Sequence, residues 1–157
     1  MFRAEIVCDR MVAYRPPRIA MGLLVAAAGI EFLIPARWPH PRSIPVAGLT
    51  IASLGFLLMI RAWWLFRVHD TAICPTAEAT FFITNDVFAL TRNPMYLGMV
   101  MMLLAVALST GGWPFYLGTL TYALILNNVF CRYEEQKMNE SFGDRYEDYA
   151  TKVRRWL

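Results

Sequence analysis

Thr91-Arg92-Asn93-Pro94-Met95-Tyr96-Leu97-Gly98 stands where a polar segment of the chain passes into a long apolar run. Tyr133-Glu134-Glu135 stands at the reverse boundary, where the next apolar run gives way to a polar tail. Ionisable groups are costly to bury beside an apolar layer, so such residues at both boundaries indicate a function. Because the apolar segments between them predict a helical hairpin, we expect the two clusters to meet at one membrane face.

Four apolar runs predict an all-α integral membrane bundle of about four transmembrane helices. They cover roughly residues 19–35, 44–66, 95–108 and 113–130. A spanning helix needs about 20 apolar residues, within a range of about 17–25, so the third run is short. A tight turn over residues 109–114 makes runs three and four a helical hairpin. The alternative is a soluble helical protein with a very apolar core, but the runs lack the polar stripe of a surface helix.

The composition agrees with a membrane protein of one domain, residues 1–157. The chain is 57% hydrophobic and 17% charged, which is more apolar than an average soluble domain. The net charge of +3 is modest, and the basic residues lie mostly at the ends of apolar runs, so no nucleic-acid partner is expected. The oligomeric state stays open. The three cysteines are Cys8, Cys74 and Cys131. Their spacing fits neither a set of metal ligands nor a disulfide framework, so no metal site is predicted.

The distribution of Lys and Arg predicts an orientation in the bilayer. Basic residues lie in the N-terminal segment, between the second and third runs and in the C-terminal tail, whereas the turn over residues 109–114 has none. The positive-inside rule places both termini in the cytoplasm, and we expect a bacterial-type inner membrane. Arg37 and Arg42 would then lie outside, a mild violation. Charged residues among the first ten argue against a cleaved signal peptide.

Several polar residues lie inside the runs or follow them. We expect Arg61 to snorkel to the interface and Glu31 to be exposed at the outer end of the first run. Asn127 and Asn128 could bond across helices or line a pocket. The tail predicts an amphipathic helix with a boundary near Gly143, because its apolar residues are spaced by four, three, four and three positions: Phe142, Tyr146, Tyr149, Val153 and Trp156.

Taken alone, each boundary cluster has a local explanation. Asn93 is a favoured N-cap and Pro94 a favoured first helical residue, so the first cluster could simply start a helix. Glu134 and Glu135 could be a solvated pair at a helix end.

Together, five ordered elements over residues 69–157 resemble the membrane methyltransferase family that includes isoprenylcysteine carboxyl methyltransferases and phospholipid N-methyltransferases. Residues 69–157 are on that resemblance the cofactor-binding half, and residues 1–68, which match only as apolar runs, are N-terminal transmembrane helices. The elements are His69-Asp70-Thr71 through Pro75, Thr84-Asn85-Asp86-Val87-Phe88, Arg92 to Gly98, Glu134-Glu135, and Phe142-Gly143 through Trp156.

The resemblance implies S-adenosylmethionine-dependent methyl transfer to a lipid-like or other hydrophobic acceptor at the cytoplasmic membrane face. It implies catalytic roles for Arg92 and Glu135, with Glu135 as the principal carboxylate. Arg132, one residue out of register with the family's acceptor-contacting arginine, is the candidate for that contact, and residues 80–83 correspond to another cofactor segment. The residues implied to bind the cofactor are Phe88, Asn93, Pro94, Met95, Tyr96, Glu134 and Glu135.

Elementary chemistry is consistent with these roles. The cofactor carries a sulfonium and an ammonium group, which a carboxylate near the membrane boundary can pair with. Phe88 and Tyr96 offer π faces to the adenine or the sulfonium, and Arg92 can hold a carboxylate in a two-pronged fork. Methyl transfer is an in-line displacement, so positioning and desolvation can supply most of the rate.

Two positions depart from the family pattern. Asp70 and Asp86 stand where glycine is usual, and Asn85-Asp86 must supply the tight turn that the second glycine permits, which both residues tolerate better than most.

Two other functions stay open: a nicotinamide-dependent reductase of the sterol reductase type, and a non-enzymatic membrane protein that retains the fold. The acceptor atom, whether oxygen, nitrogen or sulfur, is undetermined.

Overall fold

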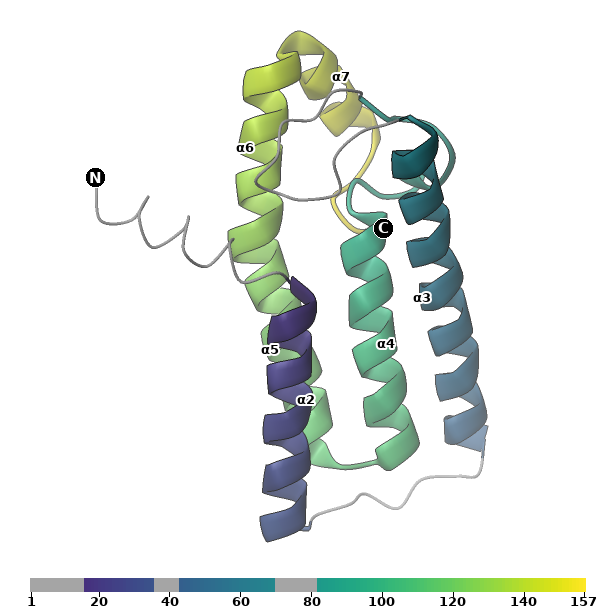
Figure 1. Cartoon of the computed structure of the whole chain (residues 1–157), viewed down its shortest axis with the longest axis vertical. Coiled ribbons are helices and arrows are strands. Elements are labelled where there is room, and N and C mark those ends of the chain that lie inside the picture. Colours follow the sequence, from purple (N-terminus) through teal and green to yellow (C-terminus); the bar gives the residue numbers. More distant parts are fainter. Residues whose placement is uncertain (1–15, 36–42, 70–81) are drawn as a thin grey trace, which may run out of the picture.

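The computed structural model describes residues 16–35, 43–69 and 82–157, which contain helices and no strand (Figure 1). This confirms the all-α prediction for the described residues. In chain order the elements are α2 Pro16–Leu33, α3 Ser43–Val68, the 3₁₀ turn η1 Asp86–Ala89, α4 Pro94–Thr110, α5 Trp113–Ile125, the π-helical η2 Leu126–Phe130, α6 Cys131–Phe142 and α7 Asp144–Lys152.

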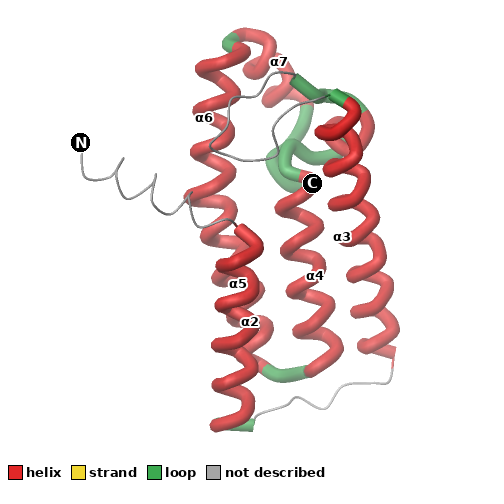
Figure 2. The backbone as a smooth tube through the Cα atoms, in the orientation of Figure 1, coloured by secondary structure: helices red, strands yellow, loops and turns green. Residues whose placement is uncertain are grey.

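The four apolar helices form a bundle that one long helix extends. α3 packs along α4, α4 packs against α5, and α5 packs against α2 (Figure 1). Figure 2 shows α5, η2 and α6 continuing as one rod beyond the other helices, with α7 turning back from its tip. The C-terminus lies beside the start of α4 (Figure 1). The polar segments before α4 and after η2 therefore lie at the same end of the bundle.

Glycines let α3 and α4 approach closely. A Cβ atom added to Gly98 would lie 2.6 Å from the Gly55 carbonyl oxygen and 2.4 Å from the Cγ atom of Met59. A Cβ atom on Gly55 would in turn lie 2.9 Å from the Gly98 carbonyl oxygen. Backbones that pack this tightly leave no room for a side chain, an arrangement common between membrane helices.

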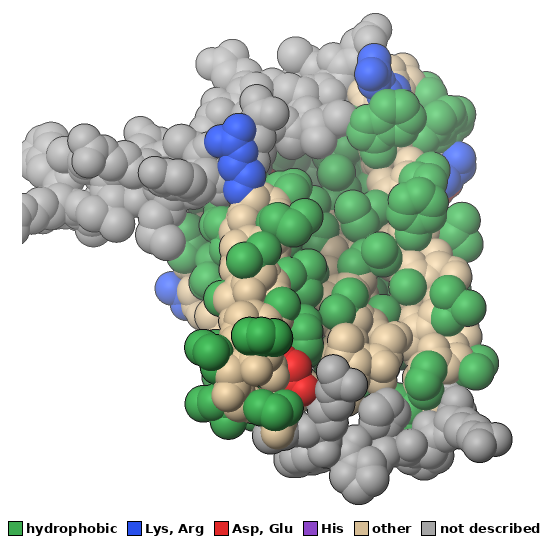
Figure 3. Space-filling view, turned by 60° about the horizontal axis from the view of Figure 1, so that its bottom comes forward, with side chains coloured by type: hydrophobic (Ala, Val, Ile, Leu, Met, Phe, Trp, Pro, Cys, Tyr) green, Lys and Arg blue, Asp and Glu red, His purple; other side chains and the backbone are tan. Residues whose placement is uncertain are grey.

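Two helices have the length and apolar character of membrane spans. Residues Pro16–Leu33 and Ile44–Val68 have mean hydropathies of 1.4 and 1.8, and α4 is apolar but shorter. Only 11% of the α3 window is buried within the protein, so most of its apolar side chains face outward. Figure 3 shows hydrophobic side chains spread over the described part of one face of the bundle, with backbone visible between them.

The predicted hairpin is present as α4 and α5. The carboxylate of Glu31, which comes from α2 and lies beside the turn of this hairpin, is placed differently from the prediction. Gly111, in the left-handed conformation at φ 69°, ends α4, and Gly112 precedes α5. Glu31 is only 8% exposed, so the expectation that it lies on the surface is wrong. The carboxylate is covered by the turn, because a Cβ atom on Gly112 would lie 2.6 Å from its Oε2 atom.

The tail follows the predicted pattern only in part. The helix breaks at Gly143, as expected, where φ is 49°, and α7 begins at the next residue. The predicted stripe ran on to Trp156, but α7 ends at Lys152 and Val153 is extended. Val153 and Trp156 therefore lie outside the helix, because the last residues bond to the start of α4.

Candidate functional site

The segment before α4 is joined to the C-terminal residues by three hydrogen bonds. The Arg92 N–H donates to the Arg154 carbonyl over 3.0 Å. The Thr91 hydroxyl and the Asn93 side-chain amide both donate to the Arg155 carbonyl, over 3.0 and 3.1 Å. The first boundary cluster, which begins at Thr91, is therefore bonded directly to the C-terminal residues.

The local explanation for the start of α4 holds for one of its two residues. Pro94 occupies the first turn of the helix, as expected. Asn93 stands at the N-cap position, but its side chain makes no capping hydrogen bond. Since its amide bonds to the tail, Asn93 links two segments rather than ending one.

Glu135 is the centre of an ion-pair cluster. Arg155 donates to both of its carboxylate oxygens, from Nε over 2.7 Å and from a terminal nitrogen over 2.5 Å. Arg92 lies 3.3 Å from the same carboxylate. Asn127, whose role the sequence left open, accepts hydrogen bonds from Arg155 and from the Trp156 indole, at 3.0 and 3.1 Å. This carboxylate is shared between two guanidinium groups.

Glu134 has a different environment. It accepts a short hydrogen bond from the Tyr96 hydroxyl and belongs to none of the salt bridges among the described residues. Burial, with a smaller contribution from the charge of Glu135, raises the pKa of this carboxyl to about 7, and the Tyr96 hydrogen bond and the charge of Lys137 oppose the shift. A half-buried carboxylate that forms none of the salt bridges among the described residues is poised to receive a ligand cation.

These carboxylates border a cavity of about 110 Å³ at the end of the bundle. Aromatic rings form much of its wall, and Phe82 stacks on Phe142 at a centroid distance of 5.0 Å. The Tyr149 hydroxyl donates to the Phe88 carbonyl over 2.5 Å, which ties α7 to η1. The lining residues are Phe66, Phe82, Ile83, Phe88, Arg92, Asn93, Glu134, Glu135, Met138, Tyr146 and Tyr149.

Arg92 brings a spare donor to this cavity. One terminal nitrogen donates to the Tyr146 hydroxyl over 3.3 Å, and the same nitrogen faces Glu135. Its Nε atom is buried and has no hydrogen-bond partner among the described residues. An unsatisfied buried donor is costly, and here it stands beside a space that a ligand with an acceptor group could enter.

The turn at η1 accommodates the aspartate that replaces a glycine. Asp86 has a φ of 59°, the left-handed region that favours glycine but that aspartate tolerates. Its carboxylate accepts from the Val87 N–H over 2.8 Å and forms a fork with Arg61, with a closest distance of 2.5 Å. The Arg61 guanidinium holds the pKa of the Asp86 carboxyl below its usual range.

Arg61 therefore does more than snorkel. Its side chain runs from α3 to the loop before α4, and it also lies over the Trp64 ring at 4.5 Å. The prediction located the charge correctly near the end of α3 but missed its partner, which lies 25 positions along the chain.

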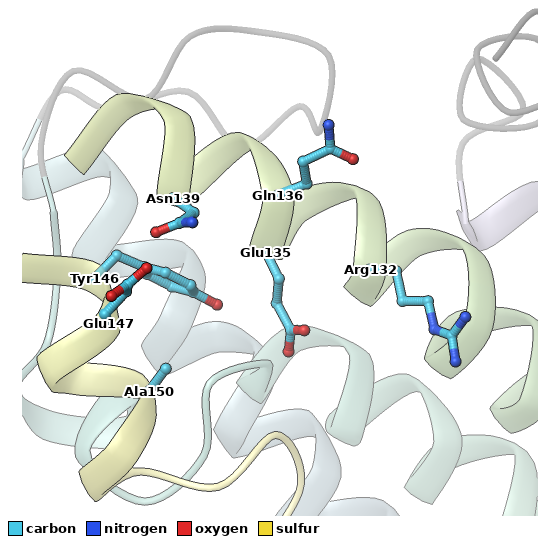
Figure 4. A pocket seen from close by; sticks show the side chains of 7 residues that line it. All are labelled: Arg132, Glu135, Gln136, Asn139, Tyr146, Glu147 and Ala150. Carbon is cyan, nitrogen blue, oxygen red and sulfur yellow. The ribbon is translucent and has the colours of Figure 1, made fainter. Parts of the chain in front are cut away.

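Arg132 lies in a separate, shallow depression outside the cavity. Figure 4 shows the seven residues that line it, with Arg132 at one end and Tyr146 and Glu147 at the other. Glu135 and Tyr146 border both spaces. The depression and the cavity therefore adjoin at Glu135 and Tyr146.

The structure brings five of the predicted site residues to the cavity wall and leaves three behind it. Phe88, Arg92, Asn93, Glu134 and Glu135 line the cavity. Pro94 and Tyr96 are buried within α4, and Met95 packs against the apolar cluster of α3 and η1. Tyr96 reaches the site through its hydroxyl.

Other lining residues were not predicted as site residues. Tyr146 and Tyr149 belonged to the apolar stripe of the tail, which is the signal that could have indicated them. Arg155 was part of the closing pattern, but nothing in the sequence paired it with Glu135. Of the segment over residues 80–83, Phe82 and Ile83 line the cavity, and the remainder lies outside the described residues, as do residues 70–75.

Within the described ranges, no group of three or more His, Cys, Asp or Glu side chains is placed to hold a metal ion. The ionisable and aromatic groups that line the cavity are carboxylates, a guanidinium group and rings of Phe and Tyr.

Comparison with known proteins identifies relatives by sequence. A family model described as phospholipid methyltransferase matches residues 44–145. An uncharacterized protein of Haemophilus influenzae is 40% identical over 63 residues, which are 40% of this chain and 100% of that protein. No solved structure matches the chain.

Proposed function

This chain belongs to the phospholipid methyltransferase family, and on that premise we propose that it transfers a methyl group from S-adenosylmethionine to a lipid-like acceptor at the cytoplasmic face of a membrane. The observation that carries the cofactor assignment is Glu134, a carboxylate at the cavity that has a hydroxyl partner but no salt bridge among the described residues. The cofactor supplies cations of the kind that such a group binds.

The residues at the cavity suit the different parts of the cofactor. Glu134 would pair with its ammonium or sulfonium group. Phe88 would offer a ring face, and the spare Nε donor of Arg92 would take its carboxylate. Pro94, Met95 and Tyr96 would support the wall, Tyr96 by orienting Glu134. The enclosed volume of about 110 Å³ is below the roughly 300–1,000 Å³ of ordinary ligand pockets, so part of the ligand would occupy the mouth.

The proposed reaction needs no nucleophile from the protein. The cofactor supplies an electrophilic methyl group, and the acceptor heteroatom displaces the thioether as the new bond to carbon forms. The part of this chain is to align the two reactants and to exclude water, which can provide most of the rate for an in-line displacement. Glu135 acts in this proposal by holding Arg92, whose spare Nε donor binds the cofactor's carboxylate.

The membrane arrangement is part of the same proposal. α2 and α3 would cross the bilayer, and the α4–α5–η2 hairpin would complete a bundle of four spans, with α6, α7 and both termini in the cytoplasm. The exposed apolar side chains of α3 support contact with lipid. An acceptor with a lipid tail would then reach the cavity laterally, past the end of α3.

Calorimetry on the detergent-purified protein, with mixed phospholipids present, tests the cofactor assignment. We expect micromolar binding of S-adenosylmethionine, weakened about thirtyfold or more in Glu134→Gln because a buried charge loses its partner. Glu140→Gln is the matched control, because Glu140 is on the same helix but exposed, and it should bind as the wild type does. A folded wild-type protein that ignores S-adenosylmethionine but binds NADPH would instead support a reductase.

A further inference from the structure

The last five residues, Val153 to Leu157, form a segment that we call the C-terminal clasp. Its main chain bonds to the residues before α4: the Arg154 carbonyl accepts from Arg92, and the Arg155 carbonyl accepts from Thr91 and Asn93. Its side chains bond to the other side of the site. Arg155 grips Glu135, and both Arg155 and Trp156 donate to Asn127. The clasp therefore bridges α4 to η2 and α6.

The fork from Arg155 dominates the surroundings of Glu135. It occupies both carboxylate oxygens at 2.7 and 2.5 Å, whereas Arg92 approaches one of them at 3.3 Å. A two-pronged guanidinium–carboxylate pair fixes orientation as well as charge. The Glu135 side chain is 20% exposed and that of Arg155 26% exposed, so the pair is partly shielded from water and is screened less than a surface pair.

The two glutamates therefore differ in the positive charges that surround them. Glu135 is already neutralised by Arg155 and Arg92, so it has little attraction left for a cationic ligand. Glu134, one residue earlier, takes part in none of the salt bridges among the described residues. A ligand cation that enters the cavity meets one carboxylate that is satisfied and one that is not.

We propose that Arg155 is a positioning residue of the site: it holds Glu135 as an anchor for Arg92 and so leaves Glu134 as the carboxylate that receives the cofactor's cation. This inference rests on the proposed function for the identity of the ligand. It differs from the sequence-based expectation, in which Glu135 is the principal cofactor carboxylate. It also makes the end of the chain part of the site.

Four proteins test the proposal: the wild type, Arg155→Gln, Arg155→Lys and the control Arg154→Gln. Arg154 is the adjacent residue, its side chain is exposed, and its contribution to the site is a carbonyl that the substitution keeps. The control thus removes the same charge from the same segment. For each protein the KM for S-adenosylmethionine and kcat are measured with labelled cofactor and phospholipid vesicles, beside the melting temperature without ligand.

We expect Arg155→Gln to raise the KM for S-adenosylmethionine about tenfold, because Glu135 loses one charge-assisted hydrogen-bonded partner. Arg155→Lys should recover part of this, because it keeps the charge but loses the fork. Arg154→Gln should match the wild type. A purely structural clasp would lower the melting temperature of Arg155→Gln and leave its KM unchanged, and that result would overturn the proposal. A KM that falls would also overturn it, because Arg155 would then be a competitor of the cofactor.

A double-mutant cycle of Arg155→Gln and Glu135→Gln on the ligand-free melting temperature separates this inference from the proposed function. If the wild type neither binds nor transfers, the proposed function fails, and the cycle still reports on the clasp. We expect the double variant to melt close to the single variants, because both remove the same contact. Additive losses would show that Arg155 does not hold Glu135.

Discussion

Helix α4 is fastened in two different ways. Along its length it packs on α3 through close backbone contact at Gly55 and Gly98. At its start it is held by hydrogen bonds and ion pairs to the C-terminal clasp and to α6. The first interface is specified by the absence of side chains, and the second is specified by the direction of charged and polar ones.

The two fastenings suit two environments. Inside a bilayer, polar bonds between helices are not needed for packing, and small residues allow van der Waals contact over a long surface. Hydroxyls in α3 accordingly bond within their own helix, from Thr50 to Val46 and from Ser53 to Leu49. At the polar end, the first turn of α4 and the segment before it must present Tyr96 and Arg92 at fixed angles. The apolar interface should therefore fail when volume is added, and the polar end should fail when charge is changed.

The largest effect is expected from Gly98→Ala. The new methyl group would lie 2.6 Å from the backbone oxygen of Gly55, and overpacking of this kind costs about 1–3 kcal/mol or more because the helices must separate. We expect a large drop in melting temperature and in the monodisperse yield after detergent extraction. Gly118→Ala is the matched control, since its nearest neighbour would be 3.8 Å away, and better helix propensity should leave it as stable or more stable. Equal losses in both variants would contradict the close-packing explanation.

At the polar end, the affinity for S-adenosylmethionine should depend on pH through Glu134. The pKa of its carboxyl is about 7, so the ionised fraction, and with it the affinity for a cation, should rise about twenty-five-fold between pH 5.5 and 7.5. Calorimetry at several pH values measures this dependence. In Glu134→Gln the curve should be flat over the same interval. A wild-type affinity that does not change with pH would remove Glu134 from the cation site.

Stability should follow the opposite trend over the same interval. Because burial raises the pKa of Glu134 above the ordinary 4.5, the folded protein holds this proton more tightly than the unfolded chain does. The contribution of Glu134 to stability is therefore fully present below pH 4.5 and is lost as the pH rises towards 7. Glu134→Gln should remove that decline, and the exposed Glu140→Gln should keep it. Function and stability thus place opposite demands on one side chain.

The comparison also explains which parts of the structure could be predicted from the sequence. Apolar runs of helical length predicted the helices, and the Gly111-Gly112 turn predicted the hairpin, because both depend on neighbours in the chain. The meeting of the two boundary clusters was also predicted, and Tyr96 contacts Glu134 while Arg92 contacts Glu135. A hairpin of two similar helices necessarily returns its ends to the same level.

Contacts between distant polar residues could not be predicted in this way. The Arg155 partner of Glu135 depends on the tail leaving its helix at Lys152, which the periodic spacing of aromatic residues argued against. The burial of Glu31 depends on how closely the Gly112 turn covers it. Each outcome is set by competition among packing arrangements, and periodicity carries no information about that competition.

The smallest expected effect lies where the two fastenings adjoin, at the pair of Arg61 on α3 and Asp86 in the turn before α4. The pair is partly exposed, so its ion pair should contribute little, and the left-handed φ of 59° should matter more. We expect Asp86→Gly to melt within a few degrees of the wild type, because glycine adopts this conformation freely. Asp86→Ala should melt lowest, since alanine loses the pair and is strained as well. Arg61→Gln, which breaks the pair without altering the turn, should resemble Asp86→Gly. If Asp86→Gly and Arg61→Gln instead fell to the level of Asp86→Ala, the charge pair rather than the backbone would hold the turn, and the charge-dependent fastening would extend from the site onto α3.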